Sequence, residues 1–438
     1  MKLLAISTTA LLLLASPLAA ADPFDPLKDI PLGGEARLSL GGQLRERFES
    51  FSNPGFSIGR APGAPGSNHY LLQRLLLQAD LTLSENFRAF LQLGRFDAFD
   101  NRGGSLSATQ ENRGDIAQAF LDLGIDLDTD WRLTLRGGRQ EMNFGSGRLV
   151  SERDGPNLRR AFDGGRLMLA GPQGTKLDLF ATRPVQPLGG AFDDSSNRGE
   201  AFFGGYGTIP LAAGLSADLY VLGYEREAAR FSAGTAFEQR QTFGVRLFGR
   251  QGAFDHDVEL AGQTGSFGTQ QIRAWTASAD LGVTAGNLPW SPRLGLKADI
   301  ASGDGNPRDG RLETFNALYP KVPYFTEAGL VAPANLVDLY PSLRLTPLPD
   351  VTLEFGLDFL WRQQREDAVY RPVPFGPLPQ TAGGSRDVGK QFQASARWKI
   401  SPHAEIRAWY VHFDVGPALA QAGGRDVDFL AAALSLTF

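Results

Sequence analysis

Cysteine is absent from the 438-residue chain, and histidine occurs only four times. The lack of cysteine excludes a disulfide framework and a thiolate metal site, so rigidity must come from the fold. The four histidines, His69, His256, His403 and His412, lie in different segments without metal-ligand spacing. Beyond the first residues, no apolar run reaches the roughly 20 residues that a membrane-spanning helix needs. A helical membrane protein is therefore not expected.

The first 21 residues have the layout of a secretory signal peptide. Lys2 gives a positive start, residues 3–15 are uncharged and apolar, and Ala19 to Ala21 form a small-residue cleavage site. We therefore predict a signal peptide over residues 1–21 and a single mature domain over 22–438. Without Lys2, the 43 basic residues of the chain fall to 42 against 48 acidic ones, a net charge of −6. This balance excludes a nucleic-acid partner recognised through bulk charge.

What the mature chain does contain is glycine, aromatic residues and alternation. It has 52 Gly and 30 Phe, and the full chain has a mean hydropathy of −0.18, as expected when half of each strand faces water. In residues 36–48, Leu38, Leu40 and Leu44 alternate with polar neighbours that include Arg45 and Arg47. Side chains at successive strand positions point to opposite faces, so one face can meet lipid and the other water.

Such alternating segments recur around the whole chain. We predict an all-β fold, a transmembrane antiparallel β-barrel of about 18 strands with a lumen narrowed by inward loops. The predicted strands begin near residues 36, 70, 86, 116, 131, 164, 175, 200, 216, 240, 255, 270, 292, 335, 351, 388, 403 and 427. The longer polar insertions, predicted to be outer or constriction loops, are 50–68, 145–163, 184–199, 303–334 and 364–387. The last strand ends at Phe438, which resembles the C-terminal signal of outer-membrane barrels.

Catalytic and metal motifs are weak. Ser57 lies in one G-x-S-x-G match, but in a Pro/Gly-rich loop instead of a strand-to-helix turn, so we do not expect a catalytic serine. Asp304, Asn306 and Asp309 could offer oxygen atoms to Ca²⁺, although an ordinary turn explains them better than a calcium loop does. We predict neither an enzyme nor a cofactor.

The stronger chemical signal is the placement of basic residues at positions predicted to face water. Rings of Arg or Lys in a confined pore attract anions and repel cations. The alternative is that these residues pair with acids on the same wall and leave no net preference. The set comprises Arg45, Arg47, Arg74, Arg88, Arg132, Arg136, Arg246, Lys297, Arg344, Arg362, Arg397 and Arg407, and the acids include Asp80, Asp122, Asp299, Glu354 and Asp358.

Two stretches resemble the alginate export family of outer-membrane barrels. One runs over residues 138–164 and contains GRQEMNFGSGRLV, and the other runs over 310–339 and contains GRLETFNALYP. The resemblance implies a monomeric 18-stranded barrel with a basic constriction for anionic polysaccharide. It places Arg139, Arg159, Arg160 and Asp163 near that constriction and gives Asn316 and Asn335 a part in shaping the second stretch, with loop anchoring as the alternative for all six.

The functional prediction is an outer-membrane channel that passively conducts anionic saccharides of the alginate or uronate type. An anion-selective porin for small carboxylates or aromatic acids is the first alternative, and an outer-membrane hydrolase or adhesin the second. The expected partners are the saccharide and outer-membrane lipid, with room for periplasmic proteins. The predicted constriction residues are Arg45, Arg47, Arg74, Arg136, Arg139, Arg159, Arg160, Asp163, Lys297 and Arg362.

Overall fold

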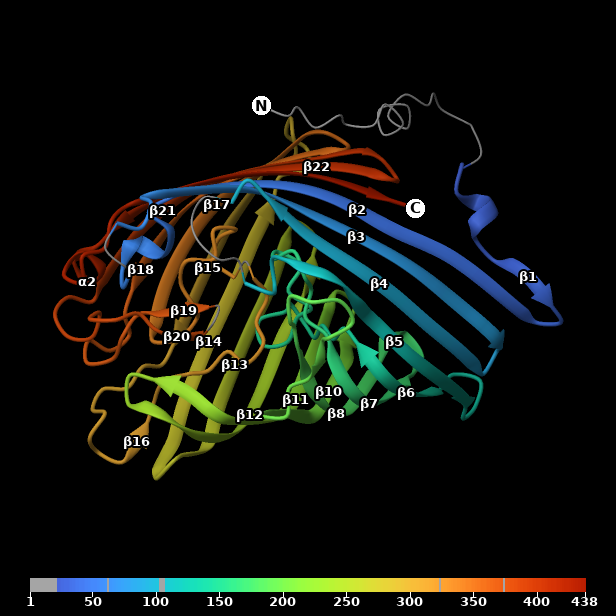
Figure 1. The fold of residues 1–438 in the computed structure, drawn as a ribbon, viewed down its shortest axis with the longest axis horizontal. Coiled ribbons are helices and arrows are strands. Elements are labelled where there is room, and N and C mark those ends of the chain that lie inside the picture. Colours follow the sequence, from blue (N-terminus) through green and yellow to red (C-terminus); the bar gives the residue numbers. More distant parts are fainter. Residues whose placement is uncertain (1–21, 61–62, 102–106, 323, 373–374) are drawn as a thin grey trace.

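The computed structural model describes residues 22–60, 63–101, 107–322, 324–372 and 375–438. The predicted signal peptide, residues 1–21, lies outside these residues. Eighteen strands of the described chain close into one antiparallel barrel (Figure 1). They are β2 (Ala36–Ser52), β3 (Ser67–Ser84), β4 (Phe87–Phe99), β5 (Asn112–Asp126), β6 (Arg132–Gln140), β7 (Phe162–Ala170), β8 (Lys176–Gln186), β10 (Glu200–Ala212), β11 (Leu215–Phe231), β12 (Gly234–Gln251), β13 (Phe254–Phe267), β14 (Gln270–Thr284), β15 (Arg293–Ala301), β17 (Leu336–Leu348), β18 (Val351–Trp361), β21 (Asp387–Ser401), β22 (Ala404–Val415) and β23 (Val427–Thr437).

The remaining elements are short. The strands are β1 (Ile30–Gly33), β9 (Ser195–Ser196), β16 (Arg311–Leu312), β19 (Tyr370–Pro372) and β20 (Phe375–Pro377), and the helices are η1 (Asp25–Leu27), η2 (Pro54–Ser57), η3 (Pro172–Gly174) and α2 (Pro417–Ala420). Three of these strands extend the barrel sheet, where β1 pairs with β2, β9 with β8 and β16 with β14. Among the described residues, no helix has the length and apolarity required to cross a membrane.

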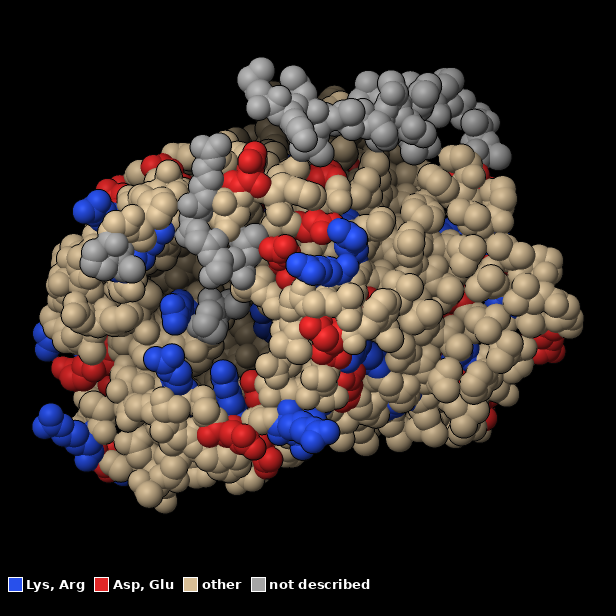
Figure 2. Space-filling model, viewed as in Figure 1, with Lys and Arg blue, Asp and Glu red and all other residues tan. Residues whose placement is uncertain are grey.

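Alternation along each strand explains why the chain forms this wall. On β3, Leu75 and Leu77 point outward and are 36% and 49% exposed, whereas Arg74 has no exposed surface. The outer surface in Figure 2 accordingly carries broad uncharged areas, and Lys and Arg side chains gather around an opening in the face shown. An apolar exterior around a polar interior is the arrangement that a lipid bilayer imposes on a barrel.

The barrel closes where its first strand meets its last. β2 pairs with β3 on one side and with β23 on the other, in a register that sets Gln43 opposite Thr437. Two further backbone hydrogen bonds of 3.1 Å join Gly42 to Phe438. The ring of Phe24 lies 5.4 Å from that of Phe438, so the N-terminal segment and the C-terminus occupy the same end of the barrel (Figure 1). Short connections join the strands at this end, called the turn end. The long loops lie at the opposite, loop end, together with the tight turns between β11 and β12 and between β13 and β14.

Candidate functional site

Two loops fold into the lumen instead of standing above it. We call residues 141–161, between β6 and β7, the first inner loop, and residues 302–335, between β15 and β17, the second inner loop. Backbone hydrogen bonds join the two loops: the Ser151 amide donates to the Tyr319 carbonyl, and the Tyr319 amide to the Leu149 carbonyl, each at 2.9 Å. The Lys321 amide donates to the Gly147 carbonyl at 2.8 Å. The two loops therefore form a single obstruction within the barrel.

Arg45 and Arg74 attach the first inner loop to the wall at β2 and β3. Arg45 Nη1 donates to the Asp154 carbonyl at 2.8 Å, and Arg74 Nη1 donates to the Asp154 carboxylate at 2.6 Å. Three further Arg74 hydrogen bonds reach the carbonyls of Asn157, Asp154 and Pro156. Because Arg74 has no exposed surface, it acts here as a loop anchor that a passing solute does not contact in this conformation.

The far side of the lumen holds both inner loops through β12 and β13. Arg148 of the first loop pairs with Asp257 at 2.8 Å and Glu259 at 3.0 Å. The Gln263 side chain accepts from the Asn316 amide and donates to the Asn316 carbonyl of the second loop, at 3.0 and 2.7 Å. The inner loops consequently span the lumen from one wall to the other.

These loops divide the open space of the lumen into two cavities. The turn-side cavity has a volume of about 860 Å³ and opens beside His403 and Thr437, whereas the loop-side cavity has about 520 Å³ and lies beside Pro184 and Asn197. Of the described residues, Arg159 alone lines both cavities. The Arg159 side chain therefore lies between the two cavities.

Arg159 is held between two carboxylates of the first inner loop. Its Nε donates to Asp154 at 2.7 Å, and its Nη1 lies 3.8 Å from Glu141. Burial alone would raise the pKa of Asp154, but the charges of Arg74 and Arg159 hold that pKa well below its usual range. Burial raises the pKa of Glu141, although the charge of Arg159 opposes this. Asp154 is therefore a fully ionised partner of Arg159, whereas Glu141 is more distant and its charged form is disfavoured by burial.

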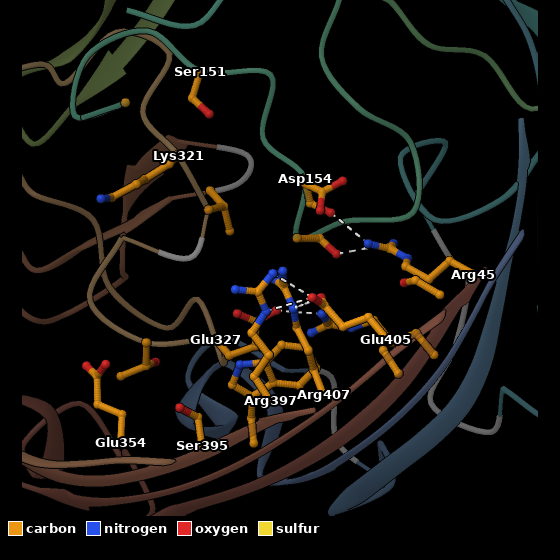
Figure 3. A pocket seen from close by; sticks show the side chains of 18 of the residues that line it. Arg45, Ser151, Asp154, Lys321, Glu327, Glu354, Ser395, Arg397, Glu405 and Arg407 are labelled. Carbon is orange, nitrogen blue, oxygen red and sulfur yellow. Dashed lines mark hydrogen bonds and ion pairs between the residues drawn. The ribbon is translucent and has the colours of Figure 1, made fainter. Parts of the chain in front are cut away.

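The wall of the turn-side cavity adds a second group of charges, shown in Figure 3. Glu405 pairs with Arg397 at 2.6 Å and with Arg407 at 2.5 Å, so one carboxylate serves two guanidiniums. Arg47 pairs with Glu49 and Glu327, both at 2.5 Å, and lies 4.9 Å from the Trp409 ring. These three arginines are therefore all paired, and three carboxylates balance their charge.

Several predicted residues lie in wall pairs or in loop scaffolds. Arg136 binds Asp122 at 2.7 Å and lines neither cavity, and Arg139 binds Asp163 at 2.8 Å at the edge of the loop-side cavity. Lys297 pairs with Asp299 at 3.2 Å in a smaller recess of about 210 Å³ that adjoins the turn-side cavity. The alternative of mutual neutralisation therefore describes these three cations well.

Arg362 follows the last residue of β18 and is 1% exposed. Its guanidinium donates to the carbonyls of Arg365, Asp367, Thr381, Gly383 and Ser385. It holds the loop between β18 and β21 and lies outside both cavity linings. Asn335 has a comparable place, because its Nδ2 donates to the carbonyls of Gln364 and Ala368 and so joins the second inner loop to this same loop.

Two cavity-lining cations carried no signal in the sequence. Lys321, labelled in Figure 3, lines the turn-side cavity and has no ion pair with any described residue. Arg153 lines the loop-side cavity, also without an ion pair in the described chain. Both lie in irregular loops, where strand alternation gives no information on which way a side chain points.

The weaker motifs have local explanations. The Ser57 hydroxyl donates to the Asn53 side chain at 3.3 Å and not to a histidine. Asp304, Asn306 and Asp309 each accept from a backbone amide two residues further on, which is the geometry of successive turns.

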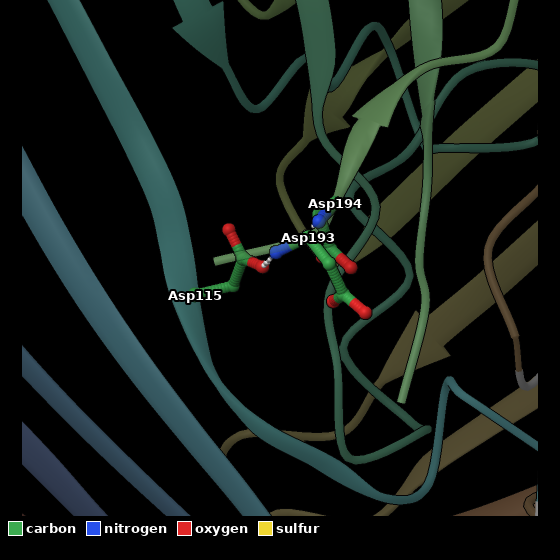
Figure 4. Close-up of side chains that lie close together, drawn as sticks. All are labelled: Asp115, Asp193 and Asp194. Carbon is green, nitrogen blue, oxygen red and sulfur yellow. Dashed lines mark hydrogen bonds between the residues drawn. The ribbon is translucent and has the colours of Figure 1, made fainter. Parts of the chain in front are cut away.

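The carboxylates of Asp115, Asp193 and Asp194 lie close enough together to suggest a metal site (Figure 4). However, Asp115 Oδ2 accepts from the backbone amides of Asp193 and Asp194, each at 2.9 Å. Arg139 Nη1 lies 3.7 Å from Asp115 Oδ1 and would repel a cation. The group therefore fastens the loop between β8 and β10 to the wall.

Comparison with known proteins identifies the family. The family model described as alginate export matches residues 36–433. The chain belongs to the alginate export family. None of the curated proteins compared with it matches. The predicted family and the 18-stranded barrel are thus confirmed.

Solved structures of outer-membrane porins share the fold. Pseudomonas aeruginosa OccK9 (OpdG) is similar with a TM-score of 0.61 and 13% identity, over 92% of this chain and 98% of that one. OpdO from the same organism gives 0.60 and 13%, over 92% and 97%. A doubly substituted variant of OccD1 (OprD) gives 0.58 and 14%, over 92% and 95%.

Family and fold together make this alginate export family member a bacterial outer-membrane channel and not an enzyme. The predicted location is confirmed, and the apolar outer wall lies against membrane lipid. In barrels of this kind the short turns face the periplasm and the long loops face outward. The turn-side cavity then opens to the periplasm and the loop-side cavity to the exterior.

Proposed function

We propose that the channel conducts carboxylate-bearing saccharides, with Arg159 as the residue that every such solute must pass. The observation that carries this proposal is the position of Arg159, which lines both cavities and is paired with carboxylates of its own loop. A solute carboxylate can exchange with Glu141, the more distant of the two partners, without leaving the guanidinium unpaired. A guanidinium also binds a carboxylate through two parallel hydrogen bonds, which favours this group over a simple halide.

The surroundings of Arg159 support an anionic solute. Basic side chains outnumber acidic ones in both linings, and in a confined space such an excess raises the local concentration of anions. Besides the buried loop anchor Arg74, the loop-side cavity has Arg139, Arg153, Arg159, Arg160 and Arg226 against Glu141, Asp194 and Glu200. The turn-side cavity has Arg45, Arg47, Arg159, Lys321, Arg397, Lys399 and Arg407 against Glu152, Asp154, Glu327, Glu354 and Glu405.

A second candidate is a porin for small carboxylates. The observation in its favour is the division of the lumen into cavities of about 860 and 520 Å³, both within the range of small-molecule sites. A polymer would have to thread past the joined inner loops, whereas a monomer could move from one cavity to the other. In either case we propose that a single barrel, surrounded by lipid, is the conducting unit and that periplasmic proteins can bind to it.

Planar-bilayer recordings test the proposal. The wild-type channel should show an anion-preferring reversal potential and should be blocked by oligouronates. Arg159→Glu should weaken that block by about tenfold or more. The reason is that the charge of residue 159 and a uronate carboxylate at 5 Å interact by roughly 3 kcal/mol at an effective dielectric constant of 20. Arg183→Glu serves as the control because Arg183 is exposed and donates only to the carbonyls of Arg198 and Glu200. A cation-preferring wild-type channel would refute the proposal. Liposome swelling with uronate monomers against oligomers separates the two candidates.

A further inference from the structure

The outer surface of the barrel carries polar side chains on three neighbouring strands, β2, β3 and β4 (Figure 1). The register sets Arg95 opposite Leu75, which points outward. Two residues further toward the loop end, a paired row on the same face joins Glu46, Gln73 and Asp97. We call Glu46, Gln73, Arg95 and Asp97 the lipid-side patch.

The lipid-side patch lies within the apolar outer surface and not at its edge. Exposed apolar side chains flank it toward the turn end, at Leu75 and Leu93, and toward the loop end, at Phe48 and Phe99. A lipid headgroup would meet the edge of the apolar surface, so it does not explain polar groups with apolar side chains on both sides. Charged groups that face hydrocarbon are costly, and in membrane proteins they generally have a functional partner.

The charges of the patch are incompletely paired. Arg95 Nε and Nη2 donate to Asp97 at 2.7 and 3.1 Å, while Nη1 donates to no described residue and the side chain is 60% exposed. Glu46 accepts from Gln73 at 2.5 Å, but its Oε2 accepts no hydrogen bond, and it has no ion pair in the described chain. Apolar contact between two proteins in a bilayer replaces equally apolar lipid, so such polar groups decide what binds. The patch thus offers both a carboxylate and a guanidinium donor.

The tilt of the strands brings Glu46 and Arg95 to about the same level. From one turn to the next, two strands on, a paired row climbs toward the loop end. Val351, at the start of β18, for example pairs with Trp398, three residues before the end of β21. Between β2 and β4, also two strands apart, the row from Glu46 climbs to Asp97, and Arg95 lies two residues back toward the turn end. Glu46 and Arg95 therefore flank β3 at similar height.

We propose that the lipid-side patch binds a second copy of this chain, in a dimer whose two-fold axis runs along the membrane normal close to β3. Such an axis sets β2 of each copy against β4 of the other, so Glu46 of each barrel meets Arg95 of the other in two equivalent ion pairs. The flanking apolar side chains of the two copies pack around these pairs. Each barrel keeps its own lumen, so this inference goes beyond the proposed function and is independent of the solute.

The absence of cysteine permits a cross-linking test on the full mature chain in the outer membrane. Leu75→Cys places a thiol on the outward face of β3, beside the axis, and should form a disulfide-linked dimer on mild oxidation. Leu260→Cys is the matched control, because Leu260 is also exposed but lies on β13, nine strands away on the opposite side of the barrel. Equal cross-linking at the two positions would overturn the dimer. A cross-link from Leu75→Cys to a different membrane protein would also overturn it and would identify another occupant.

Charge exchange in the Leu75→Cys background tests the ion pairs. Glu46→Arg and Arg95→Glu should each lower the dimer fraction by about tenfold or more, because like charges then meet away from water. The combined Glu46→Arg/Arg95→Glu variant should restore the dimer. Glu46→Gln, which keeps the size of the side chain, should also weaken the dimer, and heat-modifiable migration verifies that every variant has a closed barrel. A closed barrel that dimerises as the wild type does in all three single variants would refute the pairing.

Discussion

Removal of Arg74 is expected to release the constriction while leaving the barrel closed. The Arg74 guanidinium makes five hydrogen bonds, four of them to Asp154, Pro156 and Asn157 of the first inner loop and one to Gln43. In Arg74→Ala these contacts vanish together, and Asp154 retains only Arg159 as an ion-pair partner among the described residues. The wall itself keeps its backbone ladder between β2 and β3.

The size of the effect follows from burial. Removing one partner of a buried ion pair costs about 3–5 kcal/mol, and Asp154, whose side chain is 47% exposed, can recover part of this through water. A net loss of about 3 kcal/mol would raise the population of the detached loop roughly a hundredfold. Since the two inner loops are joined by backbone hydrogen bonds, detachment should disturb both cavities at once.

Single-channel conductance and limited proteolysis measure this change. Arg74→Ala should conduct more current with weaker anion preference, and its first inner loop should be cut faster by added protease. Arg88→Ala is the matched control, because Arg88 also faces the lumen but pairs only with wall residues, Asp80 and Asp122. Wild-type conductance together with wild-type protease resistance in Arg74→Ala would show that Arg74 does not hold the constriction.

Two further predictions concern charge and closure. Burial and the charges of Lys297 and Arg148 lower the pKa of Lys321 to about 8, so the cation is present below that pH and anion preference should fall between pH 7 and 9. Lys321→Met should remove this pH dependence, and a reversal potential that still changes as in the wild type would contradict the assignment. A Cβ at Gly42 would lie 2.6 Å from the Leu76 carbonyl and 2.7 Å from the Phe438 ring, so Gly42→Ala should lower the melting temperature and the yield of heat-modifiable barrel. Gly137→Ala, where a Cβ meets nothing within 4 Å, should not, and equal effects at the two positions would reject crowding at the seam.

Sequence alternation predicted the barrel because lipid and water impose a two-residue period on every strand. The predicted strand starts agree with the structure to within six residues, the largest difference being 240 against Gly234 for β12. The first inner loop was also expected, as an insertion over 145–163, but nothing in its sequence indicated that it pairs with the second inner loop. That pairing joins Ser151 to Tyr319, far apart in the chain, and strand periodicity carries no information on such contacts.

The alternation of polar and apolar residues along a strand also does not show which lumen-facing cations lack an ion pair. Arg136 and Lys297 occupy inward strand positions, as their parity indicated, yet each is paired with a carboxylate on the wall. Arg362 follows the last residue of β18, and the alternation of that strand predicts that it points into the lumen. In the structure its guanidinium instead donates to loop carbonyls. Parity fixes the face on which a side chain lies, whereas its partners and its depth depend on loops that parity does not describe.

This distinction shows how a net acidic chain is compatible with the anion preference that we propose. Wall carboxylates neutralise wall arginines in pairs, as Asp122 does for Arg136, and Asp257 and Glu259 neutralise Arg148 of the first inner loop. The lining cations without an ion pair in the described chain are Arg45, Arg153, Arg160, Lys321 and Lys399. All but Lys399, near the periplasmic mouth, belong to the inner loops or hold one of them, so the uncompensated charge is concentrated at the partition beside Arg159. We therefore propose that selectivity depends on this local surplus and not on the total charge of the protein, because charges beyond about 8 Å are screened at physiological ionic strength.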